Sequence, residues 1–389
     1  MTTARTSNLR QPLPAVSINK SNLIVFGLGF LILMGAVASI GRLLLGMGAT
    51  TNLSDTYPWG IWIGFDFLMI ALAGAGFTMA AAAHVFHIQS LKPAVRPAIL
   101  AGMMGYVAVL LLLVLDLGRP DRFYSFIINW NLHSPLFEIS WCVLLYTTVL
   151  AIEVSPYLFE RIGWNFPVRW FFRVLTLVTI IGVTLSSLHQ STLGTLYLNM
   201  PHRLNALWYT PLLPVMFFTS SILAGLSVAM LAYLAATRIA HQQVRPETVA
   251  ALGKGIVIMG VVYATLKVGE IAIAGEMRSL LSFDAMSLLW WAEIVVGVFI
   301  PIILLVTPSL RARPLTAWVA PLFVILGIGL NRFDATLFAQ KAIGTASYVP
   351  HLLEWVSTIG ILAAAALAWY LGVRLLVIFD SKAEKKYHH

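Results

Sequence analysis

Residues 96–117 read RPAILAGMMGYVAVLLLLVLDL, and this stretch decides the fold class. Its only charged residues are Arg96 at the start and Asp116 near the end. A helix needs about 20 predominantly apolar residues to cross the hydrocarbon core of a bilayer, and this stretch is long enough. We therefore expect a transmembrane helix with an ionisable group at each end.

Nine more apolar segments of similar length accompany it. The chain has 389 residues, of which 59% are hydrophobic and 11% charged, with a mean hydropathy of +0.86. Soluble domains carry about 25% charged residues. The sequence therefore predicts an all-α polytopic membrane protein of about ten helices. Prolines such as Pro97 and Pro156 are expected to mark helix ends. The other nine predicted spans are 23–47, 58–87, 134–155, 169–191, 211–237, 250–274, 285–307, 315–332 and 350–378.

The distribution of Lys and Arg predicts the orientation. Seventeen of these residues fall in the two termini and the even-numbered loops, whereas six fall in the odd-numbered loops. Cytoplasmic loops are enriched in positive charge. We therefore expect a multi-pass protein of a bacterial or archaeal cytoplasmic (inner) membrane with both termini in the cytoplasm.

A weak internal repeat suggests how the spans are grouped. The second and sixth spans both begin at a proline, and the fourth and eighth both carry a glutamate and end in proline. Two four-helix bundles with flanking helices would explain this pattern. The expected parts are a cytoplasmic segment 1–22, a first helix with its outer loop 23–57, a first bundle with the candidate site 58–210, a second bundle 211–349, and a last helix with a cytoplasmic tail 350–389.

Composition also argues against several kinds of site. The net charge of +9 is spread over short loops, which argues against nucleic-acid binding. Cys142 is the only cysteine, so the chain cannot build a Cys-ligated iron–sulfur or zinc site. A transmembrane haem needs two axial ligands at matching depth. His84 and His87 fall near one face of the membrane and His189 near the other, so we expect neither haem nor metal in this chain.

Ionisable groups in the first bundle converge when helix direction and depth are considered. The second to fifth spans place Asp66, Tyr106, Asp116, Glu138 and His189 in the outer half of the membrane, at ~1.5 Å per residue. A buried ionisable group in a span is a functional hypothesis by default. Quinone suits such a place, because it is apolar, carries two oxygens and exchanges protons.

Plainer explanations stand beside this one. Asp116 with Arg119, and Asp121 with Arg122, could be ion pairs that brace a helix end. Glu138 could interact with the helix dipole, and His189 could be a satisfied polar residue inside the bundle.

A second, looser set of acids comprises Glu153, Glu270 and Glu293. These residues could form a proton path from the cytoplasm. They could equally be buried ion pairs, of which Lys267 with Glu270 would be the simplest.

Several motifs together resemble a known family. They are LDLGRPDRF at 115–123, YPWGIW at 57–62 followed by Asp66, LFE at 136–138, EVSP at 153–156 and HQS at 189–191. These stretches resemble the NrfD/PsrC family of quinone-interacting membrane subunits. The similarity is greatest to its ten-helix branch, which includes the hydrogenase-2 membrane subunit HybB and the DsrP subunit of sulfur-metabolising complexes.

The resemblance implies a function in respiration and electron transport. Such a subunit uses quinone (menaquinone or ubiquinone) as substrate and has no redox cofactor of its own. Its partners would be a periplasmic ferredoxin-like iron–sulfur subunit and further catalytic subunits of a hydrogenase or sulfur-metabolism complex. By position, Glu138, His189, Asp116 and Tyr106 would be the quinone and proton residues. Quinone binding would also involve Asp66, Trp59 and Arg119.

Two other classes remain open at this stage. Ten helices with buried acids also fit a membrane transporter or a proton-translocating subunit. The chain could instead be a passive membrane anchor for a peripheral enzyme.

Overall fold

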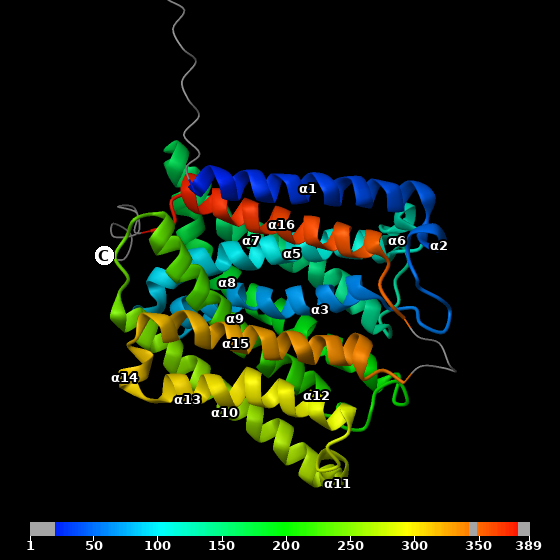
Figure 1. The fold of residues 1–389 in the computed structure, drawn as a ribbon. Coiled ribbons are helices and arrows are strands. Elements are labelled where there is room, and N and C mark those ends of the chain that lie inside the picture. Colours follow the sequence, from blue (N-terminus) through cyan, green and yellow to red (C-terminus); the bar gives the residue numbers. More distant parts are fainter. Residues whose placement is uncertain (1–19, 342–347, 380–389) are drawn as a thin grey trace, which may run out of the picture.

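The computed structural model describes residues 20–341 and 348–379, and within these ranges every regular element is a helix. Ten helical segments of the described chain are long and apolar enough to span a membrane, which confirms the predicted all-α polytopic fold. Their axes run roughly side by side (Figure 1). The first helix begins, and the last one ends, at the same end of the bundle, on the left of Figure 1.

The spans follow one another along the chain with few breaks. They are α1 (Lys20–Leu45); α3 (Ile61–Ala73) with α4 (Ala75–Ala80) and the π-helix η1 (Ala81–Val85); η2 (Gln89–Leu91) with α5 (Lys92–Asp116); α7 (Pro135–Ile162); α8 (Asn165–Leu198); α9 (Leu213–Ile239); α10 (Pro246–Ala274); α12 (Ala285–Ile294) with the π-helix η4 (Val295–Phe299) and α13 (Ile300–Val306); α15 (Pro314–Phe333) with the π-helix η5 (Asp334–Phe338); and α16 (Leu352–Leu375). Short helices in the connections are α2 (Met47–Thr50), η3 (Pro120–Arg122), α6 (Ser125–Ile128), α11 (Met277–Leu280) and α14 (Pro308–Arg311).

Two predicted helix ends are wrong. Pro97 lies inside α5, because Pro93 already occupies the first turn and starts the helix earlier. Pro156 lies inside α7, where it leaves the carbonyl of Ile152 without its usual N–H donor. The hydroxyl of Ser155 donates to that carbonyl at 2.8 Å and replaces the missing bond. Membrane helices tolerate proline where such local donors are present.

The helices pack in two groups around a common core. The first group contains α3, α4, α5, α7 and α8, and the second contains α9, α10, α12, α13 and α15. Helix α9 also packs against α3, α4, α5 and α8, so the groups share buried apolar residues. Helix α16 lies on α5, and α1 lies mainly on α16. The residue boundaries given above for the two bundles remain a prediction.

Glycine permits the closest helix contact in this outer pair. A methyl group on Gly35 of α1 would overlap the Cα atom of Gly360 in α16. Small residues allow membrane helices to approach this closely, because lipid supplies no hydrophobic force between helices. This contact fixes where α1 lies on α16.

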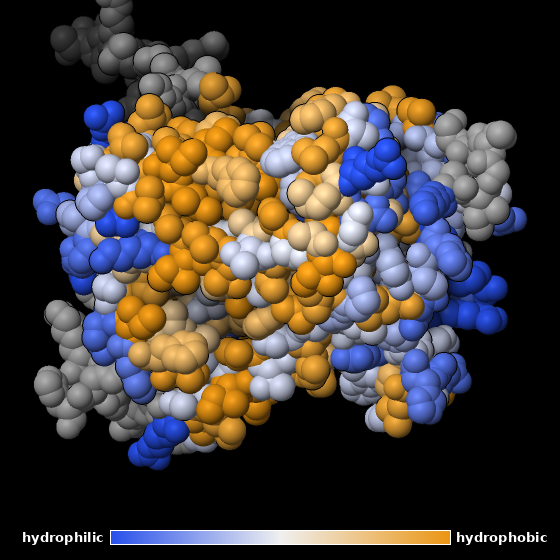
Figure 2. All heavy atoms as spheres, turned by 90° about the horizontal axis from the view of Figure 1, so that it is seen from below, coloured by the Kyte–Doolittle hydropathy of each residue, from blue (hydrophilic) through white to orange (hydrophobic). Residues whose placement is uncertain are grey.

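The surface between the two ends of the bundle is apolar. Figure 2 shows a broad hydrophobic band, with hydrophilic residues gathered at the ends of the helices. Exposed apolar side chains such as Ile258, Val261 and Ile303 come from α10 and α13. This distribution is that of a lipid-facing surface. We call the end where α3 begins and α5 ends the site end, and the opposite end the basic end.

Candidate functional site

A buried tyrosine–histidine pair joins α5 and α8. The hydroxyl of Tyr106 and Nδ1 of His189 are 2.9 Å apart, and both side chains are fully buried. The other ring nitrogen of His189, Nε2, is buried without a hydrogen-bond partner. The ring of Tyr146 from α7 packs edge-on against Tyr106, with 4.8 Å between the ring centroids. Two of the predicted site residues, Tyr106 and His189, therefore form a hydrogen-bonded pair in which Nε2 of His189 has no partner.

The neighbouring residue in α8 explains why His189 faces inward. Helix α3 breaks at Gly74, whose N–H bonds to the carbonyl of Ala71 rather than to that of Ile70. The side chain of Gln190 donates to the Ile70 carbonyl at 2.8 Å. This bond ties α8 to α3 and restricts the rotation of α8 about its axis. The sequence did not predict this function of Gln190, because it depends on the helix break.

Glu138 lies nearer the surface than predicted. It is in the first turn of α7, which begins at the N-cap residue Ser134. Its side chain is exposed in the isolated chain, and Oε1 accepts a hydrogen bond of 2.7 Å from the hydroxyl of Thr192. Because Thr192 lies one turn beyond His189 on α8, Glu138 is at the edge of the site rather than inside the pair.

A cluster of acids lies beside the pair at the site end. Asp66 of α3 is 3% exposed, and Asp116 at the end of α5 and Tyr106 in the same helix are its polar neighbours. Asp116 is the last residue of α5 and interacts electrostatically with Glu354 of α16. One oxygen each of Asp66 and Asp116 is buried without a hydrogen-bond partner.

The third acid of this cluster is fixed by its own contacts. Glu354 is fully buried and accepts hydrogen bonds from the hydroxyl of Tyr348 at 2.6 Å and from the N–H of His351 at 2.7 Å. Burial and the bond to Glu354 raise the pKa of Tyr348, so this phenol stays a donor at neutral pH. Glu354 is a site residue that the sequence analysis did not single out, because its partners depend on the loop before α16.

Trp59 and Arg119 occupy different surroundings. The ring of Trp59 packs edge-on against Tyr197 at 6.0 Å, and the guanidinium of Arg203 lies 5.2 Å from its centroid. Arg119 is exposed, and its pairing differs from both predicted ion pairs. It binds Asp121 through two hydrogen bonds of 3.1 and 3.0 Å, rather than Asp116. This contact lowers the pKa of Asp121.

The second set of acids is divided between three places. Glu293, 1% exposed, forms an ion pair of 2.9 Å with Lys267, so the predicted pairing of Lys267 with Glu270 is wrong. The reason is helix packing, which turns Lys267 into the interior toward α12. Further hydrogen bonds to Glu293 come from Trp208, Tyr263 and Asn331. Glu270 lines a cavity of about 10 Å³ beside this network, which is room for about one water molecule.

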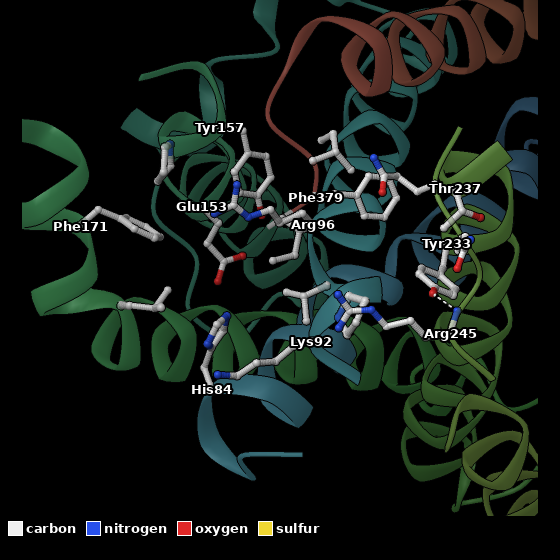
Figure 3. Close-up of a pocket in the computed structure, with 18 residues that line it drawn as sticks. His84, Lys92, Arg96, Glu153, Tyr157, Phe171, Tyr233, Thr237, Arg245 and Phe379 are labelled. Atoms are coloured by element: carbon white, nitrogen blue, oxygen red, sulfur yellow. Dashed lines mark hydrogen bonds between the residues drawn. The ribbon is translucent and has the colours of Figure 1, made fainter. Parts of the chain in front are cut away.

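Glu153 belongs to a larger cavity at the basic end. This cavity has a volume of about 200 Å³ and lies between residues of α5, α7, α8, α9 and the segment after α16 (Figure 3). The carboxylate of Glu153 points into it, as do several basic side chains (Figure 3). Its polar lining includes His84, Lys92, Arg96, Glu153 and Arg245.

An ion pair stabilises one wall of this cavity. Arg96 binds Glu160 through two hydrogen bonds of 2.9 and 3.1 Å, and it donates to the carbonyl of Val377 at 2.7 Å. A bidentate arginine–carboxylate pair fixes both side chains. The pair therefore ties α5 to α7 and to the segment that follows α16.

Across the described ranges 20–341 and 348–379, no group of three or more His, Cys, Asp and Glu side chains is arranged to hold a metal ion. His84 and His189 lie on different helices, His84 at the basic end and His189 toward the site end. The absence of haem stays a prediction.

Together the fold and these buried groups define a polytopic membrane protein with an intramembrane polar site. The chain belongs to the family described as "Polysulphide reductase, NrfD", whose family model matches residues 49–344. This confirms the resemblance seen in the motifs. Helices α1 and α16 lie outside the matched residues.

Its relatives include membrane subunits of oxidoreductases. The chain is 29% identical over 374 residues to the probable Ni/Fe-hydrogenase 2 b-type cytochrome subunit of Escherichia coli K12, covering 95% of this chain and 94% of that protein. It is 30% identical over 384 residues to the menaquinone reductase integral membrane subunit of Nitratidesulfovibrio vulgaris, covering 90% of each. The Hdr-like menaquinol oxidoreductase integral membrane subunit of Archaeoglobus fulgidus is 24% identical over 358 residues, covering 85% and 88%.

Proposed function

We propose that this chain is the integral membrane subunit of a respiratory oxidoreductase complex that exchanges electrons with the membrane quinone pool. The observation that carries the proposal is the unused Nε2 of His189, held on a fully buried side chain whose other nitrogen is bonded to Tyr106. The names of the relatives support it, since two of them are quinone oxidoreductase subunits.

The pair has the chemistry that a quinone oxygen requires. When Tyr106 donates to Nδ1, the neutral imidazole carries its proton on Nε2, and Nε2 donates to a carbonyl oxygen of the quinone. Reduction to quinol consumes two electrons and two protons. The two electrons come from the redox partner of the complex. His189 passes the Nε2 proton to that oxygen and regains a proton on Nδ1 from Tyr106, whose phenolate is reprotonated from the proton route of the cytoplasmic side. The second proton reaches the other oxygen through Glu138. Oxidation of quinol runs through the same groups in reverse.

Access to His189 requires movement of side chains. Tyr106 and His189 are both fully buried, so the head group must displace packed side chains to reach Nε2. Glu138, at the exposed edge beside Thr192, would bind the second oxygen of the ring or hand on its proton. Trp59 and Arg119 lie outside this immediate set, and we assign them to the approach surface.

The distribution of charge supports an orientation, and the orientation suggests where a partner would bind. The basic end carries the excess of Lys and Arg, which supports a cytoplasmic location for this end by the positive-inside rule. The site end then faces the periplasm, where an iron–sulfur subunit of ferredoxin type would bring its cluster close to the quinone. Electron transfer needs only proximity, so the protein contributes position, hydrogen bonds and proton access.

Glu153 offers a route for protons from the cytoplasmic side. It lines the 200 Å³ cavity and lies two turns from Tyr146 on α7, and the ring of Tyr146 packs against Tyr106. This order of polar side chains supports a proton route from the basic end to the His189 pair. Glu293 is a weaker candidate for proton transfer, because Lys267 and three other donors hold its carboxylate. We keep Glu270, which lines the small cavity beside Glu293, as a further candidate for proton transfer.

The test uses the complex that purifies with a tagged chain from native membranes. We expect iron–sulfur protein to co-purify and H189A to lower turnover of a soluble quinone, decylubiquinone or menadione, at least tenfold without loss of assembly. H133A is the matched control, because His133 is exposed at the same end. Unchanged turnover in H189A would contradict the quinone function and would favour the alternative that the chain is a passive membrane anchor. Purification without any redox subunit would favour a transporter.

A further inference from the structure

We propose that Arg42 of α1 is a positioning residue of the same site, whose guanidinium balances the carboxylate of Asp116 and holds the end of α5. The inference rests on the proposed quinone function. It adds a cation that neither the motifs nor the family match includes, since α1 lies before residue 49.

Arg42 is buried although it lies in a helix that otherwise faces lipid. Its side chain is 2% exposed, whereas neighbours such as Leu43 and Leu44 are 44% and 79% exposed. One terminal nitrogen donates to the carbonyl of Leu117 at 2.6 Å, and the guanidinium lies 6.0 Å from the ring of Trp62. Leu117 directly follows Asp116, so Arg42 contacts the backbone at the point where α5 ends.

Arg42 is the buried cation that lies beside the acids around Asp116, because it binds the carbonyl of Leu117. The acids that act on one another here are Asp66, Asp116 and Glu354. Glu354 is fixed by donors from Tyr348, His351 and Asn52. Arg42 supplies the positive charge that acts on Asp116. Burying carboxylates away from water is costly unless a cation or hydrogen bonds compensate.

The groups approach without a direct ion pair. No Arg42–Asp116 contact within 4.0 Å is present in this described part of the chain, and Nε of Arg42 and one oxygen each of Asp66 and Asp116 are buried without partners. Arg42 therefore lies beside Asp116 through its bond to the Leu117 carbonyl, and we infer that its charge acts on Asp116 without a direct ion pair.

A purely structural explanation makes a different prediction. Arg42 lies in the last turn of α1, where a cation is favoured by the helix dipole, and its bond to Leu117 could serve only to dock α1. In that case the effect of removing Arg42 would not depend on the charge of Asp116. A double-mutant cycle separates the two explanations.

The experiment compares R42Q, R42K, D116N and R42Q/D116N in the co-purified complex. The probe is the quinone analogue 2-heptyl-4-hydroxyquinoline N-oxide, titrated by quenching of its fluorescence, together with turnover of decylubiquinone. We expect R42Q to raise the dissociation constant at least tenfold, R42K to stay within threefold of the unmodified chain, and R42Q/D116N to match D116N alone. R278Q is the control, because Arg278 is exposed at the same end.

Each outcome decides between the proposals. An equal fold-change from R42Q with and without D116N overturns the positioning function of Arg42. Should R42Q fail to assemble, R42Q/D116N still decides, since a neutral amide at position 116 no longer needs the cation and the double variant must then assemble. If H189A and D116N leave binding and turnover unchanged, the quinone function itself fails. If they impair both while R42Q does not, only this inference fails.

Discussion

The hydroxyl of Tyr106 lies 2.9 Å from Nδ1 of His189, and this single bond links α5 to α8 in the interior of the first group of helices. It fixes which ring nitrogen of His189 remains unused. A buried histidine with one nitrogen committed and the other unpaired is poised to bind a polar atom that arrives from the membrane.

Removal of this hydroxyl is the first prediction. Y106F leaves Nδ1 of His189 unpaired, which should cost about 1–3 kcal/mol of stability. Turnover of decylubiquinone should fall about tenfold, or ~1.4 kcal/mol of activation free energy. The control is Y197F, because Tyr197 is also fully buried and donates to the carbonyl of Ala335 at 2.9 Å. Similar losses of turnover in both variants would contradict a special function of the pair.

The buried ion pair in the second group should behave as a structural element. K267M leaves the charge of Glu293 without its cation, and such a break costs about 3–5 kcal/mol. The midpoint of thermal unfolding in detergent should therefore drop, and K267M/E293Q should recover much of the loss. K254M, at an exposed position of the same helix, should leave the midpoint unchanged. A stable K267M chain would mean that Glu293 is neutral in the native state.

Glu153 should affect proton supply rather than quinone binding. E153Q keeps the shape of the side chain but cannot ionise, so we expect turnover to fall about tenfold while the affinity for the quinone analogue is retained. The comparison is E247Q, because Glu247 is exposed in the first turn of α10. Loss of analogue binding in E153Q would place this residue in the quinone site instead.

The contact between α1 and α16 should be sensitive to a single methyl group. G35A places a Cβ atom against the backbone of Gly360, so the helices must separate, at a cost of about 1–3 kcal/mol. Proteolysis of the loop between α1 and α3 should become faster. In G27A, the added methyl group meets open space, and no change is expected. Equal protease resistance in the two variants would show that the contact is not tight.

The spans could be predicted from the sequence because the length and polarity of a membrane helix are set by the bilayer. The stretch ending at Asp116 therefore appears as a helix in both sequence and structure. Its start was predicted at the wrong place, since Pro97 reads as a helix breaker although Pro93 begins the helix. Local patterns do not show which proline will find a substitute donor.

The partners of the site residues were harder to predict. Depth arguments placed Tyr106 and His189 in one half of the membrane, and they meet directly. Such arguments do not fix helix rotation or neighbours, so the pairing of Lys267 with Glu293 was missed. The contact of Arg42 was not predicted for the same reason. Nothing in the sequence indicates that the end of α1 lies against the end of α5.

The pairing of α1 with α16 has a consequence for biogenesis. Helix α1 is the first described span to leave the ribosome, yet its main neighbour is the last span to be made. Until α16 has been inserted, α1 lacks its main neighbour in the bundle. The acid cluster at the site end includes Glu354 of α16, so it is completed only after α16 has been inserted. The site therefore forms late in membrane insertion.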